Sequence, residues 1–132
     1  MTERVKIFDT TLRDGEQAAG VSFTAEEKLR IAKILEHMKV DSIEAGFAAA
    51  SPADFDAVAQ IAREVRGTQI TTLCRAVPND VDQGWEAVRV AESPRLHVFL
   101  SSSDIHMAQH LHKNKEDVLE LARSSVARAA GY

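Results

Sequence analysis

The spacing of hydrophobic residues changes in a regular order along the chain, with short apolar runs alternating with longer amphipathic stretches. The apolar runs have the length and residue types of buried β-strands, and they lie at 5–9, 41–47, 69–74 and 95–100. Between these runs, apolar residues recur every three or four positions, as they do on one face of a helix. The pattern therefore predicts consecutive β-α units.

Residues typical of helix starts precede each amphipathic stretch. The predicted N-caps share a side chain that can accept a hydrogen bond from a free backbone N–H, and they are Thr24, Ser51, and Asn79 or Asp80. The last helix is expected from about Asn114. Glu27 follows Thr24 at the spacing of a capping box, and Pro52 fits the first helical position. Gly67 is expected to end the second helix in a left-handed conformation.

Alternating strands and helices imply right-handed crossovers and a parallel sheet covered by helices. A doubly wound sheet and part of a (β/α)8 barrel both satisfy this pattern. The chain contains no G-x-G-x-x-G motif and no P-loop, which argues against a doubly wound nucleotide-binding domain. A complete barrel takes roughly 250 residues. The 132 residues would therefore form half a barrel, and the end at Tyr132 without a further strand suggests truncation.

Composition narrows the class of protein. The chain has 16 Lys+Arg and 20 Asp+Glu, a formal charge of −4 and a pI near 5.7, without a basic stripe, so nucleic acid is not the expected partner. No run approaches the roughly 20 apolar residues of a membrane span, and no signal peptide pattern is present. The single Cys74 cannot form a disulfide framework. We expect a cytoplasmic protein.

Polar residues cluster where the predicted strands end, and ligands bind there in parallel α/β folds. They are Asp9, Arg13, Asp14, Glu16 and Gln17 after the first strand, Glu44 in the second, Arg75 after the third, and His97 in the fourth, followed by Ser101 to Asp104. A carboxylate beside an arginine, as in Arg13-Asp14, can hold a divalent cation while the guanidinium neutralises an oxyanion. The alternative is an ion pair in an exposed loop.

Glu44 and His97 lie within predicted strands, each between apolar neighbours. If Glu44 points inward, it needs a partner such as Arg13, and either a structural tie or a catalytic role fits it. His97 is either a hydrogen-bonded core residue or a partner for a substrate carboxylate or carbonyl.

Two other reactive residue types are assigned no catalytic role. His106, His110 and His112 lack the carboxylate of a zinc-protease motif and are expected on a helical surface. Cys74 is expected to be a small buried hydrophobe.

Residues 8–17, FDTTLRDGEQ, resemble the first strand and loop of the DRE-TIM metallolyases. More narrowly, they resemble the family of 2-isopropylmalate, homocitrate and citramalate synthases. Blocks at 43–47, 51–55, 75–76 and 95–106 are similar to successive blocks of that family. The similarity covers nearly the whole chain.

This resemblance implies an α/β fold in which residues 1–132 form the (βα)4 amino-terminal half of a TIM (β/α)8 barrel. The unit would be a partial pyruvate-carboxyltransferase-like catalytic domain. The implied reaction joins acetyl-CoA to a 2-oxo acid. In the isopropylmalate branch, which the block at 95–106 resembles most, 2-oxoisovalerate gives 2-isopropylmalate and CoA in leucine biosynthesis. Homocitrate or citramalate synthesis, or a non-catalytic half-barrel that binds a ligand or assembles with a partner, are the alternatives.

The resemblance also implies residue roles. Asp14 would bind a divalent metal (Mg, Mn or Zn), and Arg13 would contact the 2-oxo acid and stabilise developing negative charge. Glu44 would orient the arginine within the substrate site, and His97 would lie on the substrate side. The family's His-x-His ligands and its catalytic acid or base fall outside these residues, so we expect an incomplete metal site and a fragment inactive alone. The full-length enzyme is expected to be a homodimer.

Overall fold

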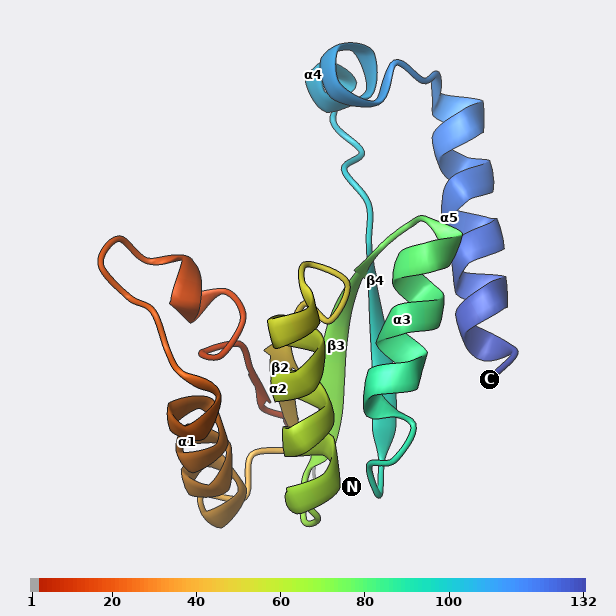
Figure 1. Cartoon of the computed structure of the whole chain (residues 1–132). Helices are drawn as coiled ribbons and strands as arrows, with labels where there is room; N and C mark the ends of the chain where they lie inside the picture. Colours follow the sequence, from red (N-terminus) through yellow and green to blue (C-terminus); the bar gives the residue numbers. More distant parts are fainter. Residues whose placement is uncertain (1–2) are drawn as a thin grey trace.

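The computed structural model describes residues 3–132 and contains one parallel sheet of four strands in the order β1-β2-β3-β4 (Figure 1). The strands are β1 (Phe8–Asp9), β2 (Ser42–Gly46), β3 (Gln69–Arg75) and β4 (Pro94–Phe99). The longer helices are α1 (Ala25–His37), α2 (Pro52–Glu64), α3 (Pro78–Val88) and α5 (Lys115–Ala130). Shorter helices are the 3-10 helix η1 (Gly15–Gln17), α4 (Asp104–His106) and the π-helix η2 (Met107–Leu111).

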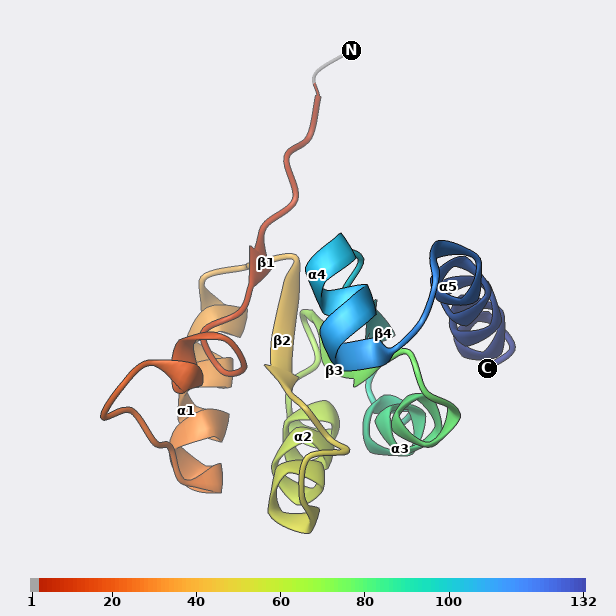
Figure 2. The same cartoon turned by 90° about the horizontal axis from the view of Figure 1, so that it is seen from above.

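The helices that connect the strands lie on one side of the sheet. Seen from above, α1, α2, α3 and α5 follow the outside of an arc, and the strands form its inner line (Figure 2). A doubly wound sheet would carry helices on both faces. Sequential parallel strands with helices on one side are instead the arrangement of a (β/α)8 barrel, so the predicted half-barrel is confirmed.

The hydrophobic core lies between the sheet and the outer helices. Its fully buried members include Ile43, Ile61, Val65, Ile70 and Val88. Because side chains alternate along a strand, the residues between these core positions face the concave side. The apolar face of the sheet therefore holds the helices, and the concave face carries polar side chains.

The two predicted caps of α1 and α2 are present, and α5 has a cap as well. The Thr24 hydroxyl accepts from the Glu27 N–H and the Glu27 carboxylate accepts from the Thr24 N–H, which closes the capping box of α1. Ser51 caps α2 ahead of Pro52. Asn114 caps α5, also with a capping box.

The predicted cap of α3 is wrong. The helix starts earlier, with Val77 as N-cap and Pro78 at the first helical position, and it has no side-chain cap. Asn79 and Asp80 therefore lie inside the first turn. Proline sets the helix start here because its fixed φ suits that position and it has no N–H to satisfy.

The expected role of Gly67 is also wrong. Helix α2 ends at Glu64, and Val65 leaves the helix in an extended conformation. Gly67 is not among the residues with a left-handed φ. Instead, its N–H donates to the Glu36 carboxylate at 2.7 Å, so a side chain of α1 satisfies this backbone after the helix.

Strand β1 is shorter than predicted because a side chain replaces part of its pairing. The Asp41 carboxylate accepts from the Ile7 N–H at 2.8 Å, and the Ile7 carbonyl accepts from both Asp41 and Ser42. Only Phe8 and Asp9 then pair with β2 in regular register.

The first and last helices each keep apolar side chains on their outer flanks. Ile34 and Met38 of α1 and Leu119 and Val126 of α5 are more than half exposed. In a barrel each helix packs between two neighbours, so one flank of each terminal helix is left open here. Within residues 3–132, no helix is both long enough and apolar enough to cross a bilayer.

Candidate active site

Arg13 and Asp14 lie in the loop that follows β1, and a tight backbone turn fixes their position. The N–H groups of Arg13, Asp14 and Gly15 all donate to the Thr10 carbonyl, at 3.2, 2.8 and 3.1 Å. Leu12, in the same turn, is fully buried and packs into the hydrophobic core, which holds the turn against the core. The two charged side chains are thereby held at the carboxyl end of the sheet.

A buried ion cluster ties the rest of this loop to two helices. Lys28 in α1 is almost fully buried, and its Nζ lies 2.7 Å from Glu16 Oε2 and 3.6 Å from Asp54 Oδ1 in α2. Glu16 also accepts from the Phe23 N–H at 3.2 Å. Sequence reasoning missed Lys28. Its spacing to Ala32 and Leu35, at i+4 and i+7 on the buried face of α1, was the available signal.

Glu44 is completely buried and links the loop to the sheet. Its Oε2 accepts from Arg13 Nε at 2.6 Å, and its Oε1 lies 2.5 Å from His97 Nδ1. The structure therefore gives Glu44 the inward partner that its charge requires, and adds a second one from β4. Three positions distant in the sequence meet in one hydrogen-bonded chain.

The hydrogen bond to Glu44 fixes which nitrogen of His97 carries a proton. A carboxylate paired with a guanidinium only accepts hydrogen bonds, so His97 Nδ1 must be the donor. The edge of the His97 ring packs against Phe8, with ring centroids 5.8 Å apart. The ring is oriented from two sides, and Nε2 remains available on a side chain that is 37% exposed.

Asp14 lies next to Arg13 at the mouth of this network. Its Oδ1 lies 3.2 Å from Arg13 Nη1, and its side chain is 65% exposed. A free carboxylate at the carboxyl end of a barrel strand is a suitable oxygen ligand for a divalent cation. Among residues 3–132, however, no three His, Cys, Asp or Glu side chains come close enough to form a metal site. Asp14 fits as one ligand of a set that needs further donors.

A hollow of about 170 Å³ lies beside Arg13. Its walls are formed by the end of β2 and the loops that follow β1 and β2, together with Leu73 of β3 and Asp54 of α2. Arg13, Glu16 and Asp54 supply charge at this hollow, and Phe47 and Leu73 supply apolar surface. A small ligand with a charged end and an apolar end suits such a lining.

Arg75 is the last residue of β3, and within residues 3–132 its hydrogen bonds do not reach the Arg13 network. It donates to both carboxylate oxygens of buried Asp80, at 2.6 and 3.1 Å, which raises its pKa. Its guanidinium also lies 5.4 Å from the centre of the Phe47 ring. The bidentate pair fixes Arg75 at the rim of the strand ends, beside the hollow.

Cys74, His106 and His110 lie as expected, whereas His112 is exposed but follows the π-helix η2 in a left-handed conformation and is not on a helical surface. Cys74 is buried against α3, and burial, with Asp80 and Glu44 adding repulsion, raises its pKa to about 12. His106 and His110 are exposed and stack on each other, with ring centroids 5.3 Å apart. A thiol with this pKa remains protonated at neutral pH and is a poor nucleophile.

The chain matches the HMGL-like family over residues 4–132. This chain belongs to the HMGL-like family. The half-barrel fold agrees with this family, which is a TIM-barrel family, and the resemblance drawn from the motif at residues 8–17 is confirmed.

This HMGL-like chain is similar to proteins named 2-isopropylmalate synthase. It is 54% identical over its whole length to a 2-isopropylmalate synthase of Ruminiclostridium cellulolyticum, covering 26% of that protein. It is 56% identical over 98% of its length to a 2-isopropylmalate synthase of Syntrophus aciditrophicus, covering 25% of it. A 2-isopropylmalate synthase of Pyrococcus furiosus is 53% identical over the whole chain, which covers 26% of it. The chain thus spans about a quarter of the length of these relatives.

Proposed function

We propose that this chain forms the first half of the catalytic barrel of a 2-isopropylmalate synthase, a partial pyruvate-carboxyltransferase-like domain. The reaction is the condensation of acetyl-CoA with 2-oxoisovalerate to 2-isopropylmalate and CoA, an acyl transfer in leucine biosynthesis. The observation that carries the proposal is the hydrogen-bonded chain Arg13–Glu44–His97 beside Asp14, at the strand ends where barrel enzymes act. Identity above 50% to several 2-isopropylmalate synthases supports it.

Arg13 is the residue that faces the oxo acid in this proposal. Its Nε is held by Glu44 and its Nη1 by Asp14, while Nη2 has no hydrogen-bond partner among residues 3–132. A guanidinium held in this way presents its remaining N–H groups in a fixed direction. It can therefore donate to the carboxylate or the ketone oxygen of a 2-oxo acid and stabilise negative charge on that oxygen.

His97 is the second group on the substrate side. Glu44 holds its Nδ1, so Nε2 on the opposite side of the ring is left to contact a substrate oxygen from a side chain that is 37% exposed. Glu44 itself is fully buried and acts through its two partners. It is a positioning residue that keeps the arginine and the histidine at a fixed separation.

Asp14 would hold the divalent cation, with Mg, Mn and Zn all compatible with a carboxylate ligand. When bound, such a cation polarises the ketone of the oxo acid. The remaining lone pairs of the Asp14 carboxylate are free for this purpose, because Arg13 is its one side-chain partner among residues 3–132. The other ligands, the catalytic acid or base and most of the acetyl-CoA site would come from residues beyond these 132.

The proposal is tested by grafting. Residues 1–132 replace the matching segment of the Ruminiclostridium cellulolyticum enzyme, and CoA release from acetyl-CoA is followed with 2-oxoisovalerate, 2-oxoglutarate and pyruvate. We expect turnover with 2-oxoisovalerate to exceed that with the other two acids at least tenfold. A preference for 2-oxoglutarate or pyruvate would assign the homocitrate or citramalate reaction instead. A folded but inactive graft would support a non-catalytic half-barrel.

Two further properties remain predictions of this proposal. The chain should be inactive without the second half of the barrel, because one metal ligand is present. We also predict a cytoplasmic homodimer for the full-length enzyme, acting on small molecules rather than on nucleic acid or at a membrane.

A further inference from the structure

Two histidines lie side by side on the short helical segment between β4 and α5. His106 ends α4 and His110 lies in the π-helix η2, beyond the carboxyl end of β4 (Figure 1). Their rings are stacked, with centroids 5.3 Å apart and planes inclined by 29°. Residues four positions apart share one side of a helical turn, so the backbone itself brings the two imidazoles together.

The turn that carries the two rings is closed by its backbone. The Met107 carbonyl accepts from the His112 and Lys113 N–H groups, the latter at 3.0 Å. Met107 is also the buried residue of this segment, while both His106 and His110 are exposed. The segment is therefore anchored through Met107, and its two imidazoles are accessible from solvent.

Each of the two rings has a nitrogen that can bind a metal. His106 Nδ1 lies 2.5 Å from Ser103 Oγ, and within residues 3–132 no hydrogen bond engages His106 Nε2 or the His110 ring. When Nδ1 donates its proton to Ser103 Oγ, Nε2 carries the lone pair. Metal-binding histidines are commonly held in this way, by a hydrogen bond from the ring nitrogen that does not bind the metal. Ser103 thus orients His106, whereas the His110 ring can turn.

The separation of the two rings suits a single small cation. Zinc–nitrogen bonds are about 2.0–2.1 Å long, so one zinc ion joins two nitrogens that are roughly 4 Å apart or less. A ring nitrogen lies at the edge of its ring, so tilting two rings whose centroids are 5.3 Å apart brings their nitrogens within this range. The rotation involves exposed side chains and needs no change of the backbone.

The histidine pair has no third protein ligand in the described part of the chain. Asp104 lies two residues before His106, and its Oδ1 is 3.5 Å from Lys115 Nζ. His112 follows the turn in a left-handed conformation. Among residues 3–132, no three metal-binding side chains come together. Water molecules would complete the coordination, so the site would exchange its metal, unlike a structural site closed by four protein ligands.

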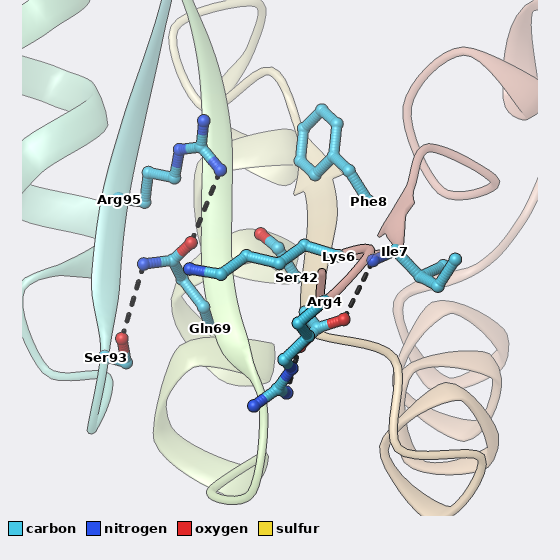
Figure 3. A pocket seen from close by; sticks show the side chains of 9 residues that line it. Arg4, Lys6, Ile7, Phe8, Ser42, Gln69, Ser93 and Arg95 are labelled. Atoms are coloured by element: carbon cyan, nitrogen blue, oxygen red, sulfur yellow. Dashed lines mark hydrogen bonds and ion pairs between the residues drawn. The ribbon is translucent and has the colours of Figure 1, made fainter. Parts of the chain in front are cut away.

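A cluster of nitrogen-bearing side chains at the other end of the sheet cannot hold a cation. Figure 3 shows this hollow at the amino-terminal ends of the strands, where Arg4, Lys6 and Arg95 contribute to the lining. Guanidinium and ammonium groups are protonated and have no lone pair to offer a metal. The imidazole pair is therefore different in kind from this basic hollow.

We propose that His106 and His110 form a second metal site, which binds a late transition-metal ion such as Zn²⁺, Ni²⁺ or Cu²⁺ through two imidazole nitrogens. Imidazole suits these ions, whereas carboxylate oxygens such as those of Asp14 suit Mg²⁺ and Mn²⁺. The bound ion bridges α4 and η2 and holds the turn closed. This inference does not depend on the proposed reaction.

Isothermal titration of the whole chain with Zn²⁺ alone tests the site. His110→Ala removes one ligand, and the affinity for Zn²⁺ should fall at least about tenfold, because the second imidazole binds an ion that the first already holds. Ni²⁺ and Cu²⁺ should bind more tightly than Mn²⁺, which is the order expected for nitrogen ligands. A chain that does not bind Zn²⁺, or that binds it equally well after His110→Ala, would overturn the proposal.

His112→Asn is the matched control. His112 is also exposed and lies in the same segment, and asparagine tolerates its left-handed conformation. This substitution should leave the affinity for Zn²⁺ unchanged, and so should Asp14→Ala. A loss in His112→Asn equal to that in His110→Ala would contradict the assigned pair. A loss in Asp14→Ala of the same size would place the ion in the loop after β1 and would also contradict it.

Hydrogen exchange supplies a second readout. The His112 N–H, which donates to the Met107 carbonyl, should exchange more slowly when Zn²⁺ is added, because an ion bound only to the closed turn stabilises that state. The slowing should be absent in His110→Ala, whose fold is checked by circular dichroism. Zn²⁺ that binds without slowing this exchange would contradict the bridging of α4 and η2.

Discussion

Gly84 in α3 lies directly against Cys74 in β3, and a Cβ on Gly84 would fall 2.5 Å from the Cys74 Sγ. Such a Cβ would also lie 3.2 Å from methyl groups of Leu96 and Thr72. The helix approaches the sheet this closely because the glycine carries no side chain. This contact sets the depth of α3 against the two strands that carry His97 and Arg75.

Gly84→Ala should therefore destabilise the chain despite improving helix propensity. Alanine in a helix interior gains about 0.5–1 kcal/mol over glycine, whereas overpacking a core costs about 1–3 kcal/mol. Urea unfolding followed by circular dichroism measures the balance. Adding Cys74→Ala should restore part of the loss, since Leu96 and Thr72 remain. A Gly84→Ala variant as stable as the parent would disprove the close contact.

Lys28→Met should release the loop that carries Arg13 and Asp14. The substitution leaves Glu16 and Asp54 without their shared cation, at a cost of about 1–3 kcal/mol. Hydrogen exchange should become faster at the Phe23 N–H, which Glu16 accepts.

Lys33→Met is the matched control. Lys33 lies on α1 like Lys28, but its ion pair with Glu64 of α2 is half-exposed. Its cost should stay within about 1 kcal/mol, without a change in exchange at Phe23. Unchanged exchange in Lys28→Met would mean that the cluster does not hold the loop.

Arg13→Ala and Asp14→Ala should differ in stability. Removing Arg13 leaves the fully buried Glu44 carboxylate with His97 alone, and breaking a buried pair costs about 3–5 kcal/mol. Asp14 is mostly exposed, so its removal should change stability by less than about 0.5 kcal/mol. In the grafted enzyme described above, both variants should lose most of the condensation activity. Equal stabilities would contradict the buried role of Glu44, and full activity in Asp14→Ala would refute its role as a metal ligand.

The contact between α3 and α5 should weaken in acid. Arg128 donates to both carboxylate oxygens of Asp82, and Tyr132 donates to one of them, which lowers the Asp82 pKa to about 2 from its usual 3.8. A carboxyl with a lowered folded-state pKa stabilises the fold above its unfolded pKa, and this contribution is lost as pH falls toward 2.

Urea midpoints from about pH 5 to about pH 2 should therefore fall more in the parent than in Asp82→Asn. Glu86→Gln, which alters an exposed pair with Arg89, is the control and should follow the parent. If the urea midpoint falls equally with pH in the parent and in Asp82→Asn, the Asp82 carboxylate does not stabilise the contact between α3 and α5.

The sequence predicted the order of strands and helices because each buried face repeats at a regular spacing. It also predicted the caps at Thr24 and Ser51, since their partners lie three residues away. It misplaced the start of α3, where Pro78 sets the first helical position and Asp80 is bound by Arg75. It also misjudged Gly67, because its N–H is bound by Glu36 of another helix, which local preference does not contain.

The candidate site was predictable in part. The strand ends located Arg13, Glu44 and His97 in one region, and charge burial suggested the Arg13–Glu44 pair. The bond between Glu44 and His97 was not predictable, because it depends on the curvature that brings β4 toward β2. The cluster around Lys28 was missed because one lysine among apolar positions has no fixed partner in the sequence.

The hydrogen-bonded chain through Glu44 joins residues separated by 31 and by 53 positions. A folding intermediate that has paired only β1 and β2 can form the Arg13 contact, but it cannot yet have the His97 contact. Contacts of such long sequence separation form late and slow the folding of a domain. The hydrogen-bonded arrangement is therefore complete only when the fourth strand has joined the sheet, and until then Glu44 lacks one of its two partners.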